Sequence, residues 1–566
     1  MLYVEMFFIF SFSYIHLRYI IFLTNMGIIS SIDTEDRTIN KNVDMVLFSQ
    51  CFEDIGCIEV TKEWYHEKHR PVNYKPLERH VIKTEFLVLG IDDSDTLVFE
   101  KASANAKSLN NAGFQRGSDV LIAIHDFTSN GYTGWIKHLA SAVLEKYSVN
   151  VISVDWEAGA EPPFDQAIAN ARVVALEIIV FINILLTLGS CKDDIHLIGH
   201  GVGAHIAGYV GQEINGLKKI SGLDPTGPRF EFMPEIVRLH AGCAKYVEVL
   251  HTDYSISVSQ GAGQFMGDAD FFINNADVQP GCKEVKHHSI LKLGRQELLP
   301  GQILPGCSHK RAFKYFIESI ENRDCVFVGV RCANYENFLD GKCISCMSDE
   351  DEDLCITFGL LAKHNITSNS SFYLNTAADS PYCLYTYAIS VELDSDKSSY
   401  TGYFEMFLTD EDNHVANLSF PDPKNKYRTY KPKSDNTYLY YASHPKLSRL
   451  KEAKVKWNKK HTLIGKFKMG KDGIPVKKIK FEPITRGSIA TTLFKPDFCG
   501  ESNMIPNGVY RTFKAYEIVP KLKPKRYGET TPLPKTTTTT AKVHKTMKIK
   551  QKSTTTEQPT MKKKRN

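Results

Sequence analysis

The stretch Ile195-His-Leu-Ile-Gly199-His200-Gly201-Val202-Gly203-Ala204-His205 combines a short apolar run with three closely spaced glycines. This pattern predicts a buried strand, a sharp turn and a helix, because glycine lets the strand and the helix pack closely. In the related pattern G-x-S-x-G, the central serine projects its hydroxyl above the sheet as a nucleophile. Gly201 holds that central position here, so the turn lacks the oxygen that would attack a substrate.

Two segments downstream carry residues that act with such a nucleophile. The apolar run Ile220-Ser-Gly-Leu ends in Asp224, and Cys307-Ser is followed by His309. The order nucleophile position, acid, histidine is the one that α/β-hydrolases use. Between about residues 45 and 365, apolar strand-like runs alternate with helical stretches, for example 149–154 before a helix over 166–188. We therefore expect an α/β fold with a mainly parallel sheet.

Further motifs give the chain a family resemblance. Val120-Leu-Ile-Ala-Ile124 precedes His125-Asp126-Phe127, where an α/β-hydrolase has half of its oxyanion hole. Together with Val154-Asp155-Trp156 and Gln279-Pro280-Gly281-Cys282, these segments resemble the pancreatic-lipase family of secreted lipases, from about residue 51 to about residue 518. The resemblance implies an α/β-hydrolase domain with triad positions at Gly201, Asp224 and His309. It also implies oxyanion-hole N–H groups at Phe127 and Val202.

Two departures from the family pattern predict an inactive catalytic site. Gly201 supplies no nucleophile, and Asp126 stands where the family has a glycine. A carboxylate beside a site that holds a developing negative charge opposes that charge. Asp224 and His309 then remain as a buried polar pair. Insect yolk proteins, which resemble lipases but lack the nucleophile, are a precedent. The alternative is an active triacylglycerol or phospholipid ester hydrolase in lipid catabolism that uses another group.

A second family site is altered in the segment Pro234-Glu235-Ile-Val-Arg238-Leu-His240-Ala-Gly-Cys243. The family holds a structural calcium here with a Glu, an Arg carbonyl and two Asp carboxylates. The resemblance places these ligands at Glu235, Arg238, His240 and Cys243. Calcium requires hard oxygen ligands, and both Asp positions are lost. We expect no calcium at this motif, and zinc on its His, Cys and Glu side chains is a weak alternative.

The chain, at 566 residues, is long enough for more than one domain. We expect a signal peptide at 1–31, a lipase-like domain at 45–370, a β-sandwich at 380–520 and a disordered Lys-, Thr- and Pro-rich tail at 521–566. Glu5 and Arg18 interrupt the apolar N-terminal segment, and a single anchor helix is its alternative interpretation. Short strand-like runs over 387–393 and 403–408 predict the sandwich, which resembles the PLAT domain of the same lipases.

Thirteen cysteines favour an oxidising, extracellular compartment, and a net charge of only +4 provides no basic field for nucleic acid. The resemblance implies four disulfides, Cys51–Cys57, Cys282–Cys307, Cys332–Cys343 and Cys346–Cys355. The spacing leaves open whether the other five cysteines are paired or are buried free thiols, namely Cys191, Cys243, Cys325, Cys383 and Cys499. Sequons at Asn365, Asn369 and Asn417 predict N-glycosylation in a secreted chain.

Two surfaces are candidates for contact with lipid or polyanions. The 24 residues between Cys282 and Cys307 match the lid of a full-length lipase in length. Their apolar face would consist of Ile290, Leu291, Leu293, Leu298 and Leu299, although a packed surface loop is the alternative. The sandwich gathers basic residues, which form either a polyanion-binding face or ordinary solvated strands: Lys424, Lys426, Arg428, Lys431, Lys433, Lys454, Lys456, Lys459, Lys460, Lys466, Lys468, Lys477, Lys478 and Lys480. Trp457 lies in a strand that we expect to be part of the sandwich core.

These features predict a secreted protein of the lipase family that lacks catalysis and acts in lipid binding, transport or storage. Its expected partner is a lipid or lipoprotein surface, with sulfated polysaccharide as a second partner through the basic face. We expect no cofactor and no nucleic acid. An extracellular matrix or polyanion-binding structural protein is a further alternative, for which the basic sandwich and the tail would be the working parts.

Overall fold

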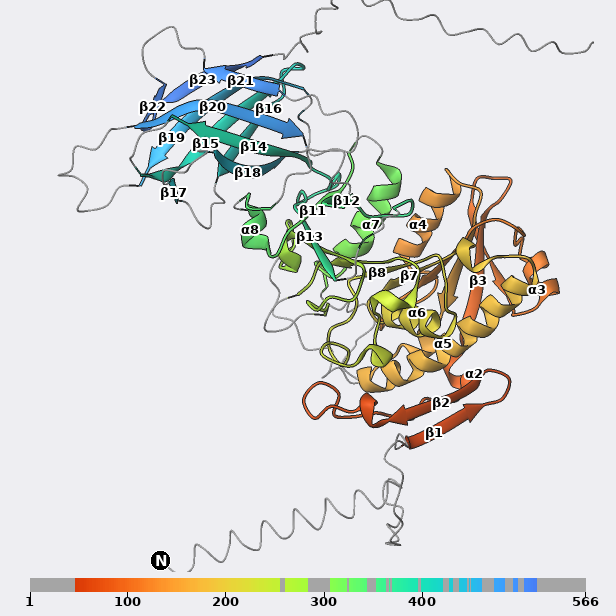
Figure 1. Ribbon diagram of the computed structural model, residues 1–566. Helices are drawn as coiled ribbons and strands as arrows, with labels where there is room; N and C mark the ends of the chain where they lie inside the picture. Colours follow the sequence, from red (N-terminus) through yellow and green to blue (C-terminus); the bar gives the residue numbers. More distant parts are fainter. Residues whose placement is uncertain are drawn as a thin grey trace, which may run out of the picture. The chain divides into compact units, whose positions relative to one another are not determined.

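The computed structural model describes residues 46–254, 260–282, 306–322, 325–339, 341–343, 353–362, 366, 369–394, 399–420, 427–430, 437–444, 447, 449–460, 473–483, 492–496 and 503–516 (Figure 1). Several of the sequence-based predictions lie outside these residues. They are the N-terminal segment 1–31, the lid over 283–305, the tail 521–566, Asn365, Cys346, Cys499 and the basic residues Lys424, Lys426, Lys431, Lys433, Lys466 and Lys468.

A mixed sheet forms the centre of the first fold unit, with the strand order β12-β11-β13-β10-β9-β8-β7-β5-β6-β3-β4. Its middle strands pair in parallel: β5 (Val120–Ile124), β6 (Asn150–Asp155), β7 (Ile195–His200), β8 (Lys219–Leu223), β9 (Val247–His251), β10 (Ala269–Ile273) and β13 (Ser370–Leu374). Its edge strands pair antiparallel: β3 (Glu85–Ile91), β4 (Leu97–Ala102), β11 (Val328–Arg331) and β12 (Cys355–Thr357). The mainly parallel sheet predicted from the sequence is confirmed.

Helices cover both faces of this sheet. Along β5, Val120, Ile122 and Ile124 belong to one apolar core with α5 (Phe164–Thr187) and α6 (Val202–Glu213). The intervening Leu121 and Ala123 belong to a second core with α4 (Gly134–Leu144) and α7 (Arg311–Glu321). Successive side chains of a strand point to opposite faces, so a continuous apolar strand fits a sheet that is buried on both sides. Apart from short 3-10 helices, the other described elements of this unit are β1 (Val46–Phe52), β2 (Gly56–Thr61), α2 (Arg79–Ile82), α3 (Ala106–Asn111) and α8 (Tyr335–Leu339).

Helix α5 is long and apolar enough to cross a membrane by length and composition. Its buried residues include Ile168, Phe181 and Leu185, which pack in the first core. Most of its apolar length is buried, so within the described part of the chain this helix is accounted for as a core helix of an α/β fold.

Antiparallel strands form the C-terminal unit, which is the predicted sandwich. The strands are β14 (Tyr385–Leu393), β15 (Tyr400–Asp410), β16 (Val415–Phe420), β17 (Arg428–Tyr430), β18 (Thr437–His444), β19 (Leu450–Lys459), β20 (Gly473–Pro483), β21 (Thr492–Pro496), β22 (Met504–Pro506) and β23 (Tyr510–Tyr516). Burial alternates along β15, as a strand with one core face requires. Trp457 is fully buried against Phe404 and Tyr430, with ring centroids 5.0 and 5.5 Å away, so it packs in the core as the sequence predicted.

Disulfides join Cys51 to Cys57, Cys282 to Cys307 and Cys332 to Cys343, as the resemblance implied. Cys355 is also disulfide-bonded. A further bond joins Cys325 to Cys383, two of the cysteines whose state the spacing left open. Cys191 is exposed and Cys243 is buried, and both are free thiols. The asparagines of two predicted sequons, Asn369 and Asn417, are exposed, and glycosylation at them stays a prediction.

Candidate functional site

The turn between β7 and α6 is the sharp elbow that the sequence predicted. Gly201 has φ 56° and ψ −117°, a backbone conformation that L side chains rarely adopt. The flanking glycines allow close packing: a Cβ on Gly199 would overlap the carbonyl group of Gly203, and a Cβ on Gly203 would overlap the carbonyl oxygen of Ile124. The chain therefore keeps the backbone of a nucleophile elbow, with a glycine where the nucleophile would stand.

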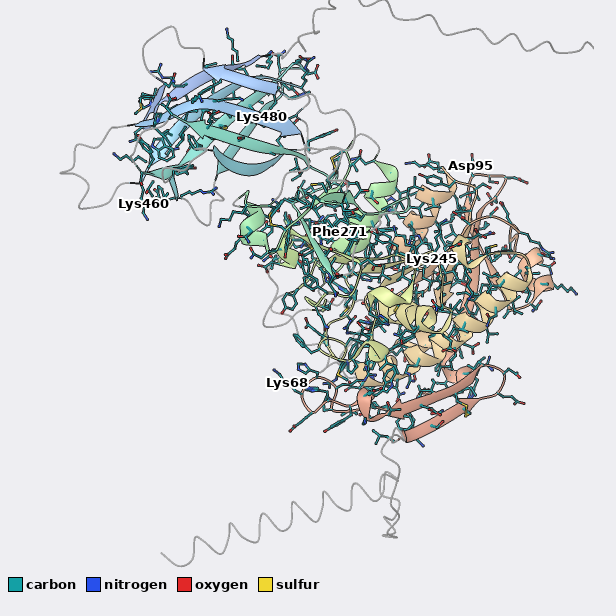
Figure 2. The ribbon with its side chains drawn as sticks, in the orientation of Figure 1. Lys68, Asp95, Lys245, Phe271, Lys460 and Lys480 are labelled. Carbon is teal, nitrogen blue, oxygen red and sulfur yellow. A yellow bond between two sulfur atoms is a disulfide. The ribbon has the colours of Figure 1, made fainter. Side chains whose placement is uncertain are left out.

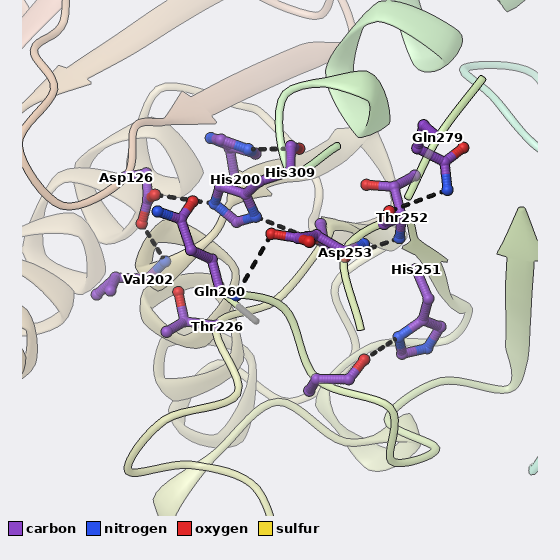
Figure 3. A network of polar contacts seen from close by, with 12 residues as sticks. Asp126, His200, Val202, Thr226, His251, Thr252, Asp253, Gln260, Gln279 and His309 are labelled. Atoms are coloured by element: carbon purple, nitrogen blue, oxygen red, sulfur yellow. Dashed lines mark hydrogen bonds and ion pairs between the residues drawn. The ribbon is translucent and has the colours of Figure 1, made fainter. Parts of the chain in front are cut away.

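The carboxylate of Asp126 fills the space above this elbow (Figure 3). Its Oδ1 accepts a hydrogen bond of 2.7 Å from the backbone N–H of Val202, the position that the resemblance assigned to the oxyanion hole. Its Oδ2 lies 3.0 Å from Nε2 of His309. The Val202 N–H, which would stabilise a developing oxyanion, is thus already bonded to a carboxylate. The same carboxylate contacts the His309 nitrogen that would take a proton from a serine.

Position 201 has no room for a side chain in this arrangement. A Cβ built on Gly201 would overlap both carboxylate oxygens and Cγ of Asp126. The carboxylate at residue 126 can therefore take this position only because residue 201 has no side chain. The sequence predicted that Asp126 opposes an oxyanion, but not that its carboxylate lies in the place of the missing hydroxyl.

The loop that carries Asp126 is held by buried contacts behind it. The His125 ring stacks on Trp156 at a centroid distance of 5.3 Å, and its Nε2 accepts a hydrogen bond from the Trp156 backbone N–H. Nε1 of Trp156 donates in return to the His125 carbonyl at 3.0 Å. These contacts join the ends of neighbouring strands β5 and β6, so the position of Asp126 is set by the core.

Asp224 and His309 lie together, as their order in the sequence predicted. Asp224 follows β8 with φ 48°, and its Oδ1 accepts from the backbone N–H groups of Thr252 and Asp253. Its Oδ2 accepts from Nδ1 of His309 at 2.6 Å. His309 therefore bridges two carboxylates, Asp224 on one ring nitrogen and Asp126 on the other.

This bridge fixes the charge of the histidine. Burial by itself lowers the pKa of His309, but hydrogen bonds to Asp126 and Asp224 and their negative charges outweigh burial and raise the pKa to about 10. Burial would also raise the pKa of Asp126, yet the hydrogen bond from His309 and its positive charge bring the pKa below its ordinary value. The two contacts thus favour the protonated form of His309, and an imidazolium cannot act as a general base.

His200 is a site residue that the sequence reasoning did not single out. Its ring lies 4.3 Å from the ring of His309, centroid to centroid, and its Nε2 lies 3.2 Å from the His309 carbonyl oxygen. Burial and the nearby positive charge of His309 lower the pKa of His200 to about 4, so this ring is neutral. The available signal was its place directly before Gly201, at the end of β7.

The altered calcium motif is closed by its own contacts. The carbonyl oxygen of Arg238, a family ligand position, accepts a hydrogen bond from Nε2 of Gln212 at 3.1 Å. Nδ1 of His240 accepts from the Gly242 N–H and lies 3.7 Å from the Glu235 carboxylate. Burial raises the pKa of the Cys243 thiol to about 12, so it is not a thiolate ligand. The described clusters of three or more metal-binding side chains do not include this motif.

Millimolar calcium should therefore leave the thermal midpoint of the protein unchanged. A ligand stabilises only by binding the folded state, and Glu235 alone keeps a carboxylate at this motif. Differential scanning fluorimetry with and without calcium measures the effect. A rise of several degrees that disappears in Glu235→Ala would show that the calcium site survives.

Three lysines of the sandwich, where Figure 2 labels Lys460 and Lys480, lie beside acidic side chains. Nζ of Lys456 lies 2.7 Å from Glu405 across the β15–β19 pair, and Lys477 pairs with Glu392 at 2.5 Å. Lys454 lies 3.8 Å from Glu452. The charge of these three lysines is therefore partly offset by a neighbouring acid. Among the other described residues of the predicted basic face, Lys459, Lys460 and Lys478 are candidates for contact with a polyanion.

The fold and the elbow define an α/β-hydrolase fold with Gly201 at the centre of the elbow. The family model for Lipase matches residues 48–382, and the chain therefore belongs to the pancreatic-lipase family. It is 32% identical over 352 residues to the human Inactive pancreatic lipase-related protein 1, covering 61% of this chain and 74% of that protein. It is 32% identical over 358 residues to human Pancreatic triacylglycerol lipase (61% and 75%), and 30% identical over 436 residues to human Pancreatic lipase-related protein 2 (75% and 90%).

Proposed function

We propose that this protein is a secreted, catalytically inactive member of the pancreatic-lipase family that binds lipid. The main support for inactivity is the Asp126 carboxylate. It lies where a side chain at residue 201 would be, and it contacts both the Val202 N–H and His309. Loss of a triad nucleophile alone costs on the order of a million-fold in the turnover of a serine hydrolase. A relative whose name includes the word inactive supports the same reading.

Exposed apolar side chains on the loops that leave the elbow's edge of the sheet support contact with lipid. The loops that follow β5, β8 and β9 leave the same edge of the parallel sheet as the elbow, since parallel strands end together. The exposed apolar side chains of these loops are Tyr132, Phe232, Ile236, Tyr254 and Phe265, with Phe232 at 59%. Exposed apolar groups at this edge would favour an interaction surface.

The test of inactivity is an assay of the purified protein on triacylglycerol and phospholipid emulsions. We expect no turnover above a heat-denatured control, and no label at residue 201 from serine-directed phosphonates, because that residue has no hydroxyl. Turnover that His309→Ala abolishes would instead support the active-hydrolase alternative.

The test of lipid binding separates apolar contact from charge. The double variant Phe232→Ser/Phe265→Ser should bind neutral lipid emulsions at least tenfold more weakly, because burying one such ring contributes roughly 1.5–3 kcal/mol. The matched control Lys460→Glu/Lys478→Glu should leave that binding unchanged. Flotation with emulsion, together with native mass spectrometry for copurified lipid, measures both.

The same variants address the matrix alternative. If the charge-reversed control loses retention on a sulfated-polysaccharide column, and if retention of the unchanged protein falls steeply with salt, the sandwich binds polyanions, because exposed charges are screened within about 8 Å at physiological salt. If neither pair of changes affects any lipid or polyanion surface, both the lipid-binding and the matrix proposals fail.

A further inference from the structure

Three side chains of ligand type converge where the nucleophile is missing. One donor atom each from Asp126, His200 and His309 lies within 4.8 Å of the other two. The three residues come from segments far apart in the sequence, after β5, at the end of β7 and before α7 (Figure 3). The side chain of His309 is 4% exposed and that of Asp126 is 16% exposed. This combination of two imidazoles and one carboxylate arises only because Asp126 reaches over a residue without a side chain.

We propose that this cluster binds a divalent transition-metal ion, for which zinc has the best-matched chemistry. Imidazole nitrogen and carboxylate oxygen are the donors that zinc accepts besides thiolate, and three protein ligands with one open position are typical of its accessible sites. Calcium and magnesium are disfavoured, because they require several oxygen ligands. The former catalytic centre of this chain is thus a metal site rather than only a disabled hydrolase.

The donors are close enough for one ion after a small outward movement. Nε2 of His309 and Oδ2 of Asp126 are 3.0 Å apart, and two ligands at about 2.0–2.2 Å from a tetrahedral zinc ion are roughly 3.3–3.6 Å apart, so the pair opens by a few tenths of an ångström when the ion replaces the Nε2 proton. The second oxygen of Asp126 is held by the Val202 N–H, which fixes the carboxylate.

An outer carboxylate already orients one ligand. Asp224 accepts from Nδ1 of His309 at 2.6 Å, which directs Nε2 toward the proposed ion. A carboxylate on the far nitrogen of a ligating histidine is the usual support of a zinc site, because it fixes the tautomer and strengthens the ligand. The fully buried carboxylate of Asp224 and the half-buried carboxylate of Asp126 also place negatively charged groups at the cluster, which suits a dication. On binding, one proton leaves Nε2 of His309 for solvent and the freed lone pair binds the metal.

Other groups of donors in the described residues fit zinc less well. Asp224, Asp253 and His309 form an overlapping group with two carboxylates and one imidazole. Asp410, Asp412 and His414 form a group in the sandwich that is exposed at two of its members. The cluster of Asp126, His200 and His309 has the most nitrogen donors and is held from outside by Asp224.

The experiment is zinc titration of the metal-stripped full-length protein by calorimetry. We expect one zinc ion per chain, with affinity at least tenfold weaker in Asp126→Asn and in His200→Gln. Asp126→Asn is nearly isosteric and can keep its contact with the Val202 N–H, so it should stay folded. Cobalt(II) substituted for zinc should give visible absorption that both variants reduce, which a purely structural role of these residues would not produce.

Two matched controls locate the site. His240→Gln in the altered calcium motif and His414→Gln in the sandwich should leave the stoichiometry and affinity unchanged. The proposal is overturned if zinc does not bind at micromolar concentration, or if it binds equally well to the folded Asp126→Asn and His200→Gln variants. Lipid flotation of the same variants in a chelating buffer keeps the two proposals separate, because the lipid proposal needs no metal.

Discussion

Ester hydrolysis should return when Asp126→Gly and Gly201→Ser are made together, whereas Gly201→Ser alone should remain inactive. In the single variant, the serine Cβ overlaps the Asp126 carboxylate, which also keeps the Val202 N–H and His309 occupied. Removing that carboxylate empties the oxyanion position, frees Nε2 of His309 and leaves Asp224 to orient the ring. We expect at least a hundredfold gain over the natural chain on short-chain esters, a small part of the roughly million-fold that a triad nucleophile contributes.

The matched controls are the single variant Asp126→Gly and the triple variant that adds His309→Ala. The first should be inactive because it has no nucleophile, and the second should lose the gain because it has no base. Phosphonate labelling at residue 201 gives a readout that is independent of turnover. A double variant that is folded but neither hydrolyses esters nor takes the label would show that the carboxylate is not what disables the site.

Stability should fall at alkaline pH through the titration of His309. Its pKa is raised from 6.5 to about 10, so the folded protein keeps a proton that the unfolded chain loses near neutrality. The resulting stabilisation is fully present below pH 6.5 and is lost as the pH rises through 10. Each pKa unit corresponds to about 1.4 kcal/mol, so the loss in the free energy of unfolding is on the order of 3–5 kcal/mol.

Urea unfolding at pH 7 and at pH 10.5, in a buffer that chelates metals, measures this loss. Asp126→Asn is the matched variant, since an amide has no charge with which to raise the pKa of His309. Lysine and tyrosine residues titrate in both proteins, so the difference between the two pH dependences measures the contribution of Asp126, while Asp224 stays in place in both. Identical pH dependences would show that Asp126 does not stabilise the protonated form of His309.

The sheet and the triad positions could be predicted because local patterns carry them. The apolar run before Gly201 and the acid at Asp224 are strand ends in sequence and in structure, and parallel strands bring such ends to one edge. His309 was found by its order along the chain. The Cys325–Cys383 bond was left open, because spacing does not determine which distant segments meet.

The effect of Asp126 on the site could be predicted only in part. Its negative charge is visible in the sequence, but the position of its carboxylate depends on how His125 packs against Trp156, which follows the neighbouring strand. The sequence also did not predict which lysines of the basic face lie beside acidic residues on neighbouring strands. Lys456 lies opposite Glu405 because of the register between β15 and β19, and register is not written in the order of the lysines.

The overlap between position 201 and Asp126 also governs how this chain can change over generations. A mutation that restores serine at 201 meets a carboxylate in its place, and a mutation that shortens Asp126 removes a buried partner of His309 while no nucleophile is present. We expect each first step to lower stability and to return no turnover on which selection could act. The two positions are then an epistatic pair, and a gain of esterase activity requires both changes together.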